Sequence, residues 1–248
     1  MEKSLKIINL SKIYHDESSE TLAIDNLNFD VFDNEIISIV GPSGCGKSTL
    51  LGILSGLTSK SNGNILFNGR KKLAYMLQRD CLMPWRTILD NCLIGLEINN
   101  TKTKENIENV KKLLTKYGLY EFKDKYPNSL SGGMRQRVAL IRTLAMNPDI
   151  LLLDEPYSAL DYQTRLKLSD DLYRIIKEEG KTAILITHDI AEAVSISNRV
   201  IVLTKRPAKI KKIYKIELNN PSVPTKNRED LKFNYYYNLI WRDIDENI

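Results

Sequence analysis

The sequence predicts an α/β fold with a phosphate-loop core, a mixed and largely parallel sheet, an antiparallel β subdomain and a helical subdomain. First, the glycine-rich string GPSGCGKST at 41–49 joins an apolar run at 36–40 to a helical pattern, which is the context of a phosphate loop. Second, the runs at 150–153 and 183–186 are continuously apolar, as in strands buried on both faces of a parallel sheet. Third, alternating segments near both ends of the chain are typical of half-buried antiparallel strands.

The first part of the chain is expected to form mainly strands. Residues 5–10 and 27–31 alternate apolar and polar side chains, and a polar loop at 15–20 separates them. The buried strand at 36–40 then leads through the glycine-rich string into a helix at 48–57. After a turn cluster, short strands are expected at 65–67 and 72–77.

The pattern becomes helical and polar from residue 88 to about 120. A further helix is expected at 134–145, behind Ser131 as its N-cap. Beyond residue 199 the segments 200–203 and 210–216 alternate and are expected to be antiparallel strands. The first helical segment should bury one face, formed by Ile107, Val110, Leu113 and Leu114. The aromatic residues Phe233, Tyr235 to Tyr237 and Trp241 are compatible with a final amphipathic helix.

The phosphate loop at 41–49 predicts a nucleoside triphosphate site. Its glycines allow backbone N–H groups to converge on a polyphosphate, and the following helix N-terminus favours an anion. Lys47 is expected to reach the terminal phosphates, and the hydroxyl of Ser48 to bind Mg²⁺. The candidate nucleotide-binding residues are Gly41, Pro42, Ser43, Gly44, Cys45, Gly46, Lys47, Ser48 and Thr49.

Polar side chains follow three further apolar strands. They are Gln78, the pair Asp154 and Glu155, and His188. Because ligands bind at the carboxyl ends of parallel strands, these groups should meet beside the phosphate loop. Asp154 is a candidate Mg²⁺ ligand, with Ser48 and Gln78, and Glu155 is expected to polarise the attacking water. His188 and Gln78 are the other candidate catalytic residues. Each residue alone has a structural alternative: a strand end, a core histidine or a solvated acidic turn.

The segment LSGG contains a second helix N-terminus that suits an anion. Ser131 is a good N-cap, and Gly132 and Gly133 follow it at the start of the helix. Alone, this is an ordinary capped helix. The chain therefore offers two helix N-termini for phosphate and one lysine-bearing loop.

In this order the motifs resemble the ATP-binding subunits of ABC transporters, with LSGGMRQR as the most discriminating element. GPSGCGKST, Gln78, ILLLDEP, SALD at 158–161 and THD at 187–189 complete the resemblance. It implies that two copies pair head to tail, so that Ser131, Gly132 and Gly133 of one chain cover the ATP that Lys47 of the other holds. It also implies that Tyr14 stacks on adenine, unless it is a core tyrosine, and that Asp161 couples the two sites. Met134 departs from the commoner glutamine of the family.

The resemblance further implies an ATP-binding domain at 1–220, a helical subdomain at about 86–147 and a C-terminal tail at 221–248, helical and packed on the core. The stretch at 79–97 resembles importers of nitrate, sulfonates, taurine and thiamine precursors. A small, anionic or heterocyclic solute, a multi-span permease, a solute-binding protein and a peripheral position on the cytoplasmic membrane face are then expected.

Two features bear on a membrane partner. No apolar run approaches the roughly 18 residues that span a bilayer, so another subunit would have to supply the spans. The apolar segment Leu82 to Trp85 either packs under the helical segment or receives a helix from a membrane subunit.

The alternative is an ABC-type ATPase that acts on a nucleic-acid or ribosome machine. With 36 basic and 31 acidic residues the net charge is +5, which gives little support to nucleic-acid binding. A phosphate-loop kinase would need an acceptor pocket and basic lid residues. A GTPase would need a guanine-reading segment after a strand, and none follows the expected strands. An exporter often has fused spans, and a binding module would not need Glu155 and His188.

Overall fold

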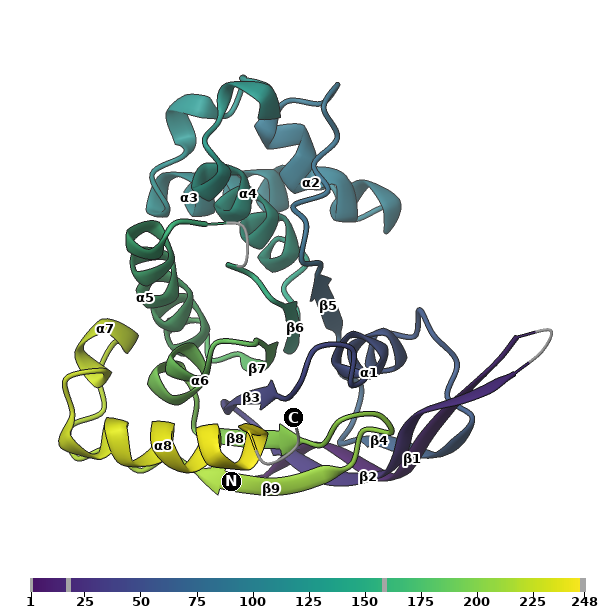
Figure 1. Cartoon of the computed structure of the whole chain (residues 1–248). Coiled ribbons are helices and arrows are strands. Elements are labelled where there is room, and N and C mark those ends of the chain that lie inside the picture. Colours follow the sequence, from purple (N-terminus) through teal and green to yellow (C-terminus); the bar gives the residue numbers. More distant parts are fainter. Residues whose placement is uncertain (1, 17–18, 158–159, 246–248) are drawn as a thin grey trace.

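A six-stranded sheet forms the centre of this computed structural model, which describes residues 2–16, 19–157 and 160–245 (Figure 1). In space the strands follow the order β5, β6, β7, β3, β8, β9. Neighbours are parallel as far as β8, and β9 is antiparallel to β8. The bounds are β3 Ile36–Val40, β5 Leu73–Met76, β6 Ile150–Asp154, β7 Thr182–Ile186, β8 Arg199–Leu203 and β9 Ile210–Lys215.

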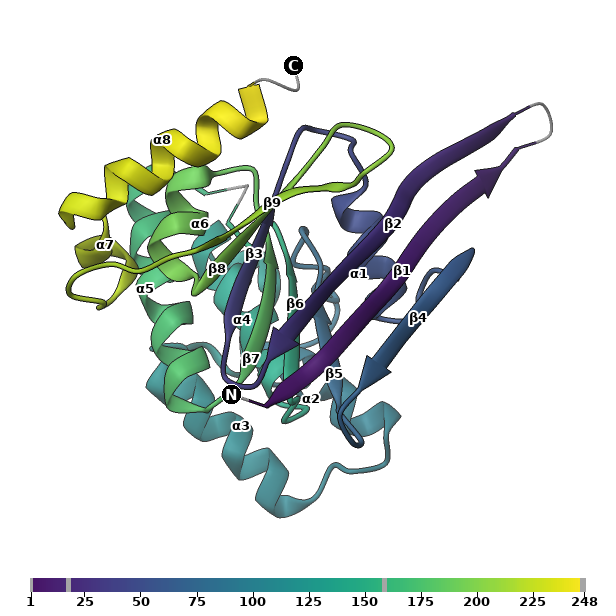
Figure 2. The same ribbon diagram turned by 90° about the horizontal axis from the view of Figure 1, so that it is seen from below.

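A second, antiparallel sheet lies beside one face of the first (Figure 2). Its order is β2 (Glu20–Phe32), β1 (Lys3–His15) and β4 (Asn62–Phe67). Between the sheets lies α1 (Lys47–Leu54), whose leucines share a buried cluster with side chains of β1, β2 and the central sheet. The antiparallel β subdomain is therefore fastened to the core by apolar packing.

The central strands are apolar throughout because both of their faces are covered. On β6, Ile150 and Leu152 pack on the α1 side. Leu151 and Leu153 point to the opposite face, where they pack against α4 (Gly132–Leu144) and α5 (Tyr162–Glu178). Successive strand residues point to opposite faces, so one continuous apolar run serves two clusters.

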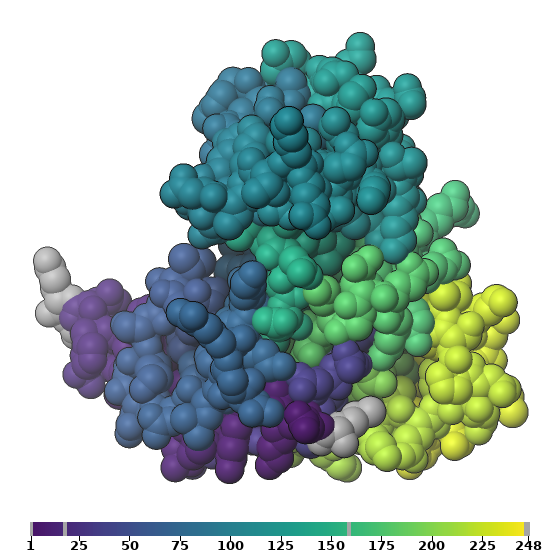
Figure 3. Space-filling model, turned by 180° about the vertical axis from the view of Figure 1, so that it is seen from behind, coloured from purple at the N-terminus to yellow at the C-terminus, as the bar shows by residue number. Residues whose placement is uncertain are grey.

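The helical subdomain contains α2 (Ile88–Ile98), α3 (Lys104–Lys116) and α4, and forms the upper lobe seen from behind in Figure 3. Thr87 and Thr103 cap α2 and α3 by accepting backbone hydrogen bonds. Short 3₁₀ turns at Tyr120–Phe122 and Pro127–Ser129 lead to α4. Val110 and Leu114 are buried in the subdomain's own cluster, which Ile107 and Leu113 border, so the expected apolar helix face is confirmed.

The last helices pack against α6 (Ile190–Ile196) and the end of the sheet. Phe233 and Ile240 of α8 (Leu231–Asp245) are buried beside β8, β9 and α6. The short helix α7 (Pro224–Asn227) links two core helices. Thr225 donates to Asp170 of α5, and Asn227 donates to the carbonyl of Ser195. Among the described residues, no helix has both the length and the apolar character needed to cross a membrane.

The predicted fold class is confirmed: a mixed, largely parallel sheet, an antiparallel β subdomain and a helical subdomain. Two local expectations are wrong. The helix expected at 48–57 ends at Leu54, because Gly56 takes a left-handed φ of 79° just behind it. The segment 200–203 pairs antiparallel with β9, as expected, but its residues do not alternate. All four are buried, because β8 lies inside the sheet and also pairs with β3.

Candidate active site

The phosphate loop connects β3 to α1 and has the backbone that an anion cradle requires. Gly44 and Gly46 adopt φ angles of 71° and 124°, where a side chain is strained. A Cβ on Gly46 would lie 3.0 Å from the carbonyl oxygen of Ala23, so the position also lacks room. The N-cap residue of α1 is Gly46, which has no side chain to cap the helix. Its first N–H groups and its dipole are thus available to a phosphate.

Lys47 lies inside this loop. Its Nζ donates to the carbonyl oxygens of Gly41 at 2.8 Å and Pro42 at 2.9 Å, and the residue is only 7% exposed. The ammonium group is therefore held where a polyphosphate would enter. Cys45 is buried behind the loop, and burial raises the pKa of its thiol. The side chain therefore fills space in the core and is not a reactive thiolate.

Asp154, at the end of β6, faces the start of α1. Ser48 Oγ donates to its Oδ1 at 3.4 Å, and the hydroxyl of Tyr75 donates to its Oδ2 at 3.0 Å. Burial raises the pKa of Asp154 despite these hydrogen bonds. Hydroxyl and carboxylate oxygens are ligands that Mg²⁺ prefers, and the ion commonly takes its other ligands from phosphate and water. Ser48 and Asp154 therefore suit a Mg²⁺ that is shared with nucleotide. Within the described ranges no cluster of three or more His, Cys, Asp or Glu side chains could hold a metal ion.

Side chains that follow three neighbouring strands, β5, β6 and β7, meet at Glu155. Its Oε2 accepts a hydrogen bond from Gln78 Nε2 at 3.0 Å and lies 3.2 Å from His188 Nδ1. Glu155 has a left-handed φ of 43°, which turns the chain sharply as it leaves β6. The structure thus brings Lys47 and Ser48 to one sheet edge with Gln78, Asp154, Glu155 and His188. This arrangement can activate a water and neutralise a phosphoryl group.

Tyr14 lies beside this edge on β1. Its hydroxyl is 3.4 Å from Oγ1 of Thr49, and Lys12 Nζ lies 4.7 Å from its ring centroid. The side chain is 39% exposed, so Tyr14 is not a core tyrosine. Its ring is available to a flat ligand next to the phosphate loop.

Gly132, the first residue of α4, lines a surface cavity together with Gln78 and Leu160, but α4 and α1 occupy different parts of the molecule (Figure 1). Ser131 caps α4 by accepting from the N–H of Met134 at 3.3 Å. Asp161 caps α5 in the same way, and the hydrogen bonds from Thr164 lower its pKa. The structure does not bring these residues to the phosphate loop of the same chain. Ser158, the first residue of the SALD motif, lies outside the described residues.

Two side chains that sequence reasoning missed contact the site. Tyr75 orients Asp154, and the pairing of β5 with β6 is the only signal that could have indicated it. Arg206 donates from Nη2 to the carbonyl of Gly44 at 2.9 Å. Nothing in the sequence near Arg206 indicates this contact.

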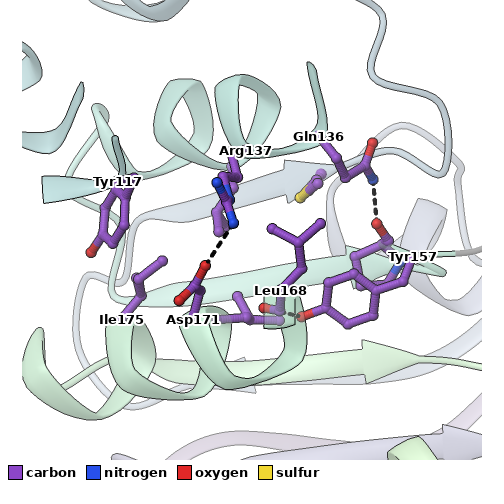
Figure 4. A pocket seen from close by; sticks show the side chains of 11 residues that line it. Tyr117, Gln136, Arg137, Tyr157, Leu168, Asp171 and Ile175 are labelled. Carbon is purple, nitrogen blue, oxygen red and sulfur yellow. Dashed lines mark hydrogen bonds and ion pairs between the residues drawn. The ribbon is translucent and has the colours of Figure 1, made fainter. Parts of the chain in front are cut away.

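A cavity lies between α4 and α5 (Figure 4), and none of the predicted site residues lines it. Two polar contacts cross it. Gln136 Nε2 donates to the carbonyl of Pro156 at 2.5 Å, and Arg137 Nη2 lies 3.2 Å from Asp171 Oδ2. We call these two contacts the joint between α4 and α5. Because Pro156 follows Glu155, the joint links α4, which Ser131 caps, to the chain segment that carries Glu155.

The apolar segment Leu82 to Trp85 packs in the helical subdomain at one end and is exposed at the other. Leu82 packs against the cluster of the helical subdomain, and Asn91 accepts from the N–H of Met83 at 2.7 Å. Trp85 is 73% exposed, so the segment presents an indole on an anchored turn.

Comparisons with known proteins cover nearly the whole chain. A family model described as ABC transporter matches residues 24–158. An uncharacterised ABC transporter ATP-binding protein of Methanocaldococcus jannaschii is 42% identical over 100% of this chain and 94% of that protein. The taurine import ATP-binding protein of Roseobacter denitrificans is 36% identical over 98% of this chain and 96% of that protein. A dimeric ATP-binding cassette in a post-hydrolysis state with ADP and Pi has a TM-score of 0.74 at 30% identity, over 86% of this chain and 99% of that chain.

Proposed function

This chain belongs to the ABC transporter family, and from that premise we propose that it is the ATP-hydrolysing subunit of an importer for a small anionic or heterocyclic solute. As an ABC-type ATPase it binds and hydrolyses ATP with Mg²⁺. The proposal assigns the ATP-binding domain to 1–220, with its helical subdomain at about 86–147, and a C-terminal tail to 221–248.

The placement of Glu155 between Gln78 and His188 carries the proposal. In this scheme Glu155 polarises the attacking water, Gln78 orients it, and His188 stabilises the transferring phosphoryl group. Ser48 and Asp154, with Gln78, would hold Mg²⁺, which neutralises charge on the phosphate oxygens. Lys47 would exchange the carbonyls of Gly41 and Pro42 for phosphate oxygens.

The separation of Ser131 from Lys47 supports a head-to-tail pair. In a two-fold dimer, Ser131, Gly132 and Gly133 of each protomer would cover the nucleotide of its partner, and Asp161 would lie between the sites. Tyr14 would stack on the adenine. The similar cassette with ADP and Pi is itself dimeric, which agrees with this arrangement.

A multi-span permease is the proposed membrane partner. Relatives include import ATP-binding proteins for taurine and for aliphatic sulfonates, which supports an importer. Trp85 and its neighbours offer an exposed apolar surface beside the Gln78 segment, where the permease would dock. The subunit would then lie on the cytoplasmic membrane face, with a solute-binding protein on the other side. The ribosome or nucleic-acid alternative is not favoured, because relatives that cover most of the chain include import ATP-binding proteins.

The test uses Glu155→Gln and, as a matched control, Glu105→Gln on the exposed side of α3. Glu155→Gln should bind Mg-ATP normally, accumulate as a dimer and hydrolyse at least roughly 100-fold more slowly, whereas Glu105→Gln should match the wild type. Wild-type chain co-purified with its permease and reconstituted in vesicles should drive uptake of taurine or an alkane sulfonate. Normal steady-state hydrolysis by Glu155→Gln would contradict the catalytic assignment. Co-purification with ribosomes in place of a permease would contradict the importer.

A further inference from the structure

Glu192 in α6 is a buried carboxylic acid to which the hydrolytic scheme gives no role. Only 3% of the residue is exposed. Burial raises its pKa from an ordinary 4.5 to about 7, against the lowering effect of a hydrogen bond from Thr187. An ionisable group is costly to bury, and a perturbed one beside a reactive site often acts in that site.

The contacts of Glu192 fix both neighbours of His188. The hydroxyl of Thr187 donates to Glu192 Oε2 at 2.5 Å, and Thr187 Oγ1 accepts from the N–H of Asp189 at 3.0 Å. Thr187 and Asp189 flank His188 in the sequence. One hydroxyl, oriented by Glu192, therefore closes the turn that presents the imidazole to Glu155.

Asp189 extends this network towards α5. Its Oδ1 accepts from the N–H of Glu192 at 3.1 Å, and its Oδ2 lies 3.3 Å from Arg165 Nη1. Arg165 Nη2 in turn donates to the carbonyl of Leu160 at 3.4 Å, just before Asp161. The turn of His188 and the start of α5 are thus joined.

A small cavity connects Glu192 directly to the hydrolytic residues. It is lined by Glu155, Tyr157, Arg165, Thr187, His188, Asp189 and Glu192, and its volume of about 10 Å³ is at the lower limit for holding one water molecule. Glu192 Oε1 has no hydrogen-bond partner in the described part of the chain. A water in this cavity would be within reach of that oxygen and of the residues around Glu155.

We propose that Glu192 is a positioning residue of the hydrolytic site, which through Thr187 holds the turn of His188 and so sets how the imidazole meets Glu155. This inference rests on the proposed function. Ionised Glu192 only accepts hydrogen bonds, so the Thr187 hydroxyl must donate to it, whereas protonation releases that constraint. Charged and titratable groups from several elements face Glu192. They are Arg165 of α5, Asp189 at the start of α6, Arg228 just after α7 in the sequence, Tyr157 just after β6, and Glu155 and His188 across the cavity.

The first test compares the full-length wild type with Glu192→Gln, whose amide oxygen accepts from Thr187 at every pH. Hydrolysis of Mg-ATP is measured on either side of about pH 7, the pKa of Glu192. In the wild type kcat should rise several-fold as Glu192 ionises, and this rise should be missing in Glu192→Gln while KM stays the same. Both proteins retain His188 and Glu155, so the difference between the profiles belongs to Glu192. Superimposable profiles would overturn the inference.

Thr187 provides a matched pair of variants. Thr187→Val removes the hydroxyl and should lower kcat without changing KM, whereas Thr187→Ser should restore turnover. Equal kcat in the valine and serine variants, both folded by circular dichroism, would contradict the route through Thr187.

A second readout needs no hydrolysis. The chain has two histidines, so His15→Gln leaves the ring signals of His188 alone in an NMR titration. Glu192→Gln in this background should shift the pH at which those signals move. Unchanged signals would count against the inference. If the signals shift but the wild type fails to hydrolyse Mg-ATP, the proposed function fails while the positioning link stands. If the wild type hydrolyses and neither readout responds, the inference alone fails.

Discussion

Gln78 Nε2 donates to Glu155 Oε2 at 3.0 Å, although 77 residues separate them in the sequence. Gln78 follows β5, and Glu155 follows the neighbouring strand β6. Gln78 also begins the segment that leads to the exposed Trp85. The amide of Gln78 therefore links the carboxylate of Glu155 to the segment that carries Trp85.

Replacing Gln78 by alanine should slow hydrolysis more than it weakens nucleotide binding. The loss of one orienting hydrogen bond at Glu155 should lower kcat roughly tenfold, because general-base catalysis depends on the position of the carboxylate. Steady-state kinetics and Mg-ATP titration of the same preparation measure the two effects. A rise in KM at unchanged kcat would assign Gln78 to binding.

Tyr75→Phe should raise the Mg²⁺ concentration needed for half-maximal hydrolysis. The phenol donates to Asp154 and opposes the rise in that residue's pKa, so its loss raises the pKa further and favours the protonated carboxyl. The added Mg²⁺ requirement should grow as the pH falls, because a protonated carboxyl binds Mg²⁺ poorly. A variant with the wild-type Mg²⁺ dependence at every pH would show that Tyr75 does not tune the site.

Mixing two inactive variants should restore part of the activity if the dimer is head to tail. Lys47→Ala damages the loop and Ser131→Arg blocks the helix N-terminus, so each homodimer carries two defective sites. A mixed dimer has one site with both defects and one intact site. The control mixes the wild type with the double variant, whose mixed dimer has no intact site. No recovery in the first mixture would argue against sharing of sites between protomers.

Glu192 should make the folded protein less stable as the pH rises. The native state still binds this proton between about pH 4.5 and about pH 7, where the unfolded chain has released it. The contribution of Glu192 to the free energy of unfolding is therefore complete below about pH 4.5 and is lost as the pH rises through about 7. Urea titrations of the wild type and Glu192→Gln across this range should diverge, with the variant relatively more stable at the alkaline end. Parallel curves would place the native pKa near its ordinary value.

The joint between α4 and α5 can be measured by a double-mutant cycle on Arg137 and Asp171. Both side chains are partly exposed, so their coupling free energy should be about 0.5 kcal/mol. Gln136→Ala should cost about 1 kcal/mol, because it removes the hydrogen bond to the Pro156 carbonyl. If the loss in Gln136→Ala is confined to stability and kcat is unchanged, the joint does not affect Glu155.

The fold class could be predicted from the sequence because its strongest patterns follow directly from burial and from backbone conformation. The doubly buried strands are apolar without interruption, and the glycines of the phosphate loop take backbone angles that strain other residues. The meeting of Gln78, Glu155 and His188 also follows, since parallel strands end at one edge.

Other features depend on tertiary contacts that no local pattern encodes. The position of β8 inside the sheet arises from pairing with β3, so its burial could not be read from alternation. Tyr75 and Arg206 reach the site from a neighbouring strand and from a distant loop. The buried carboxyl of Glu192 lies in an ordinary stretch of helix, and only packing gives it an unusual environment.

The strand that leads into the phosphate loop pairs with β7 on one side and β8 on the other. Both partners come from residues 182–203, late in the chain. During synthesis, a nascent chain that has not yet reached them cannot place β3 inside a sheet, however complete its glycine-rich string. The ability to hold nucleotide should thus be acquired only after residues 182–203 have left the ribosome.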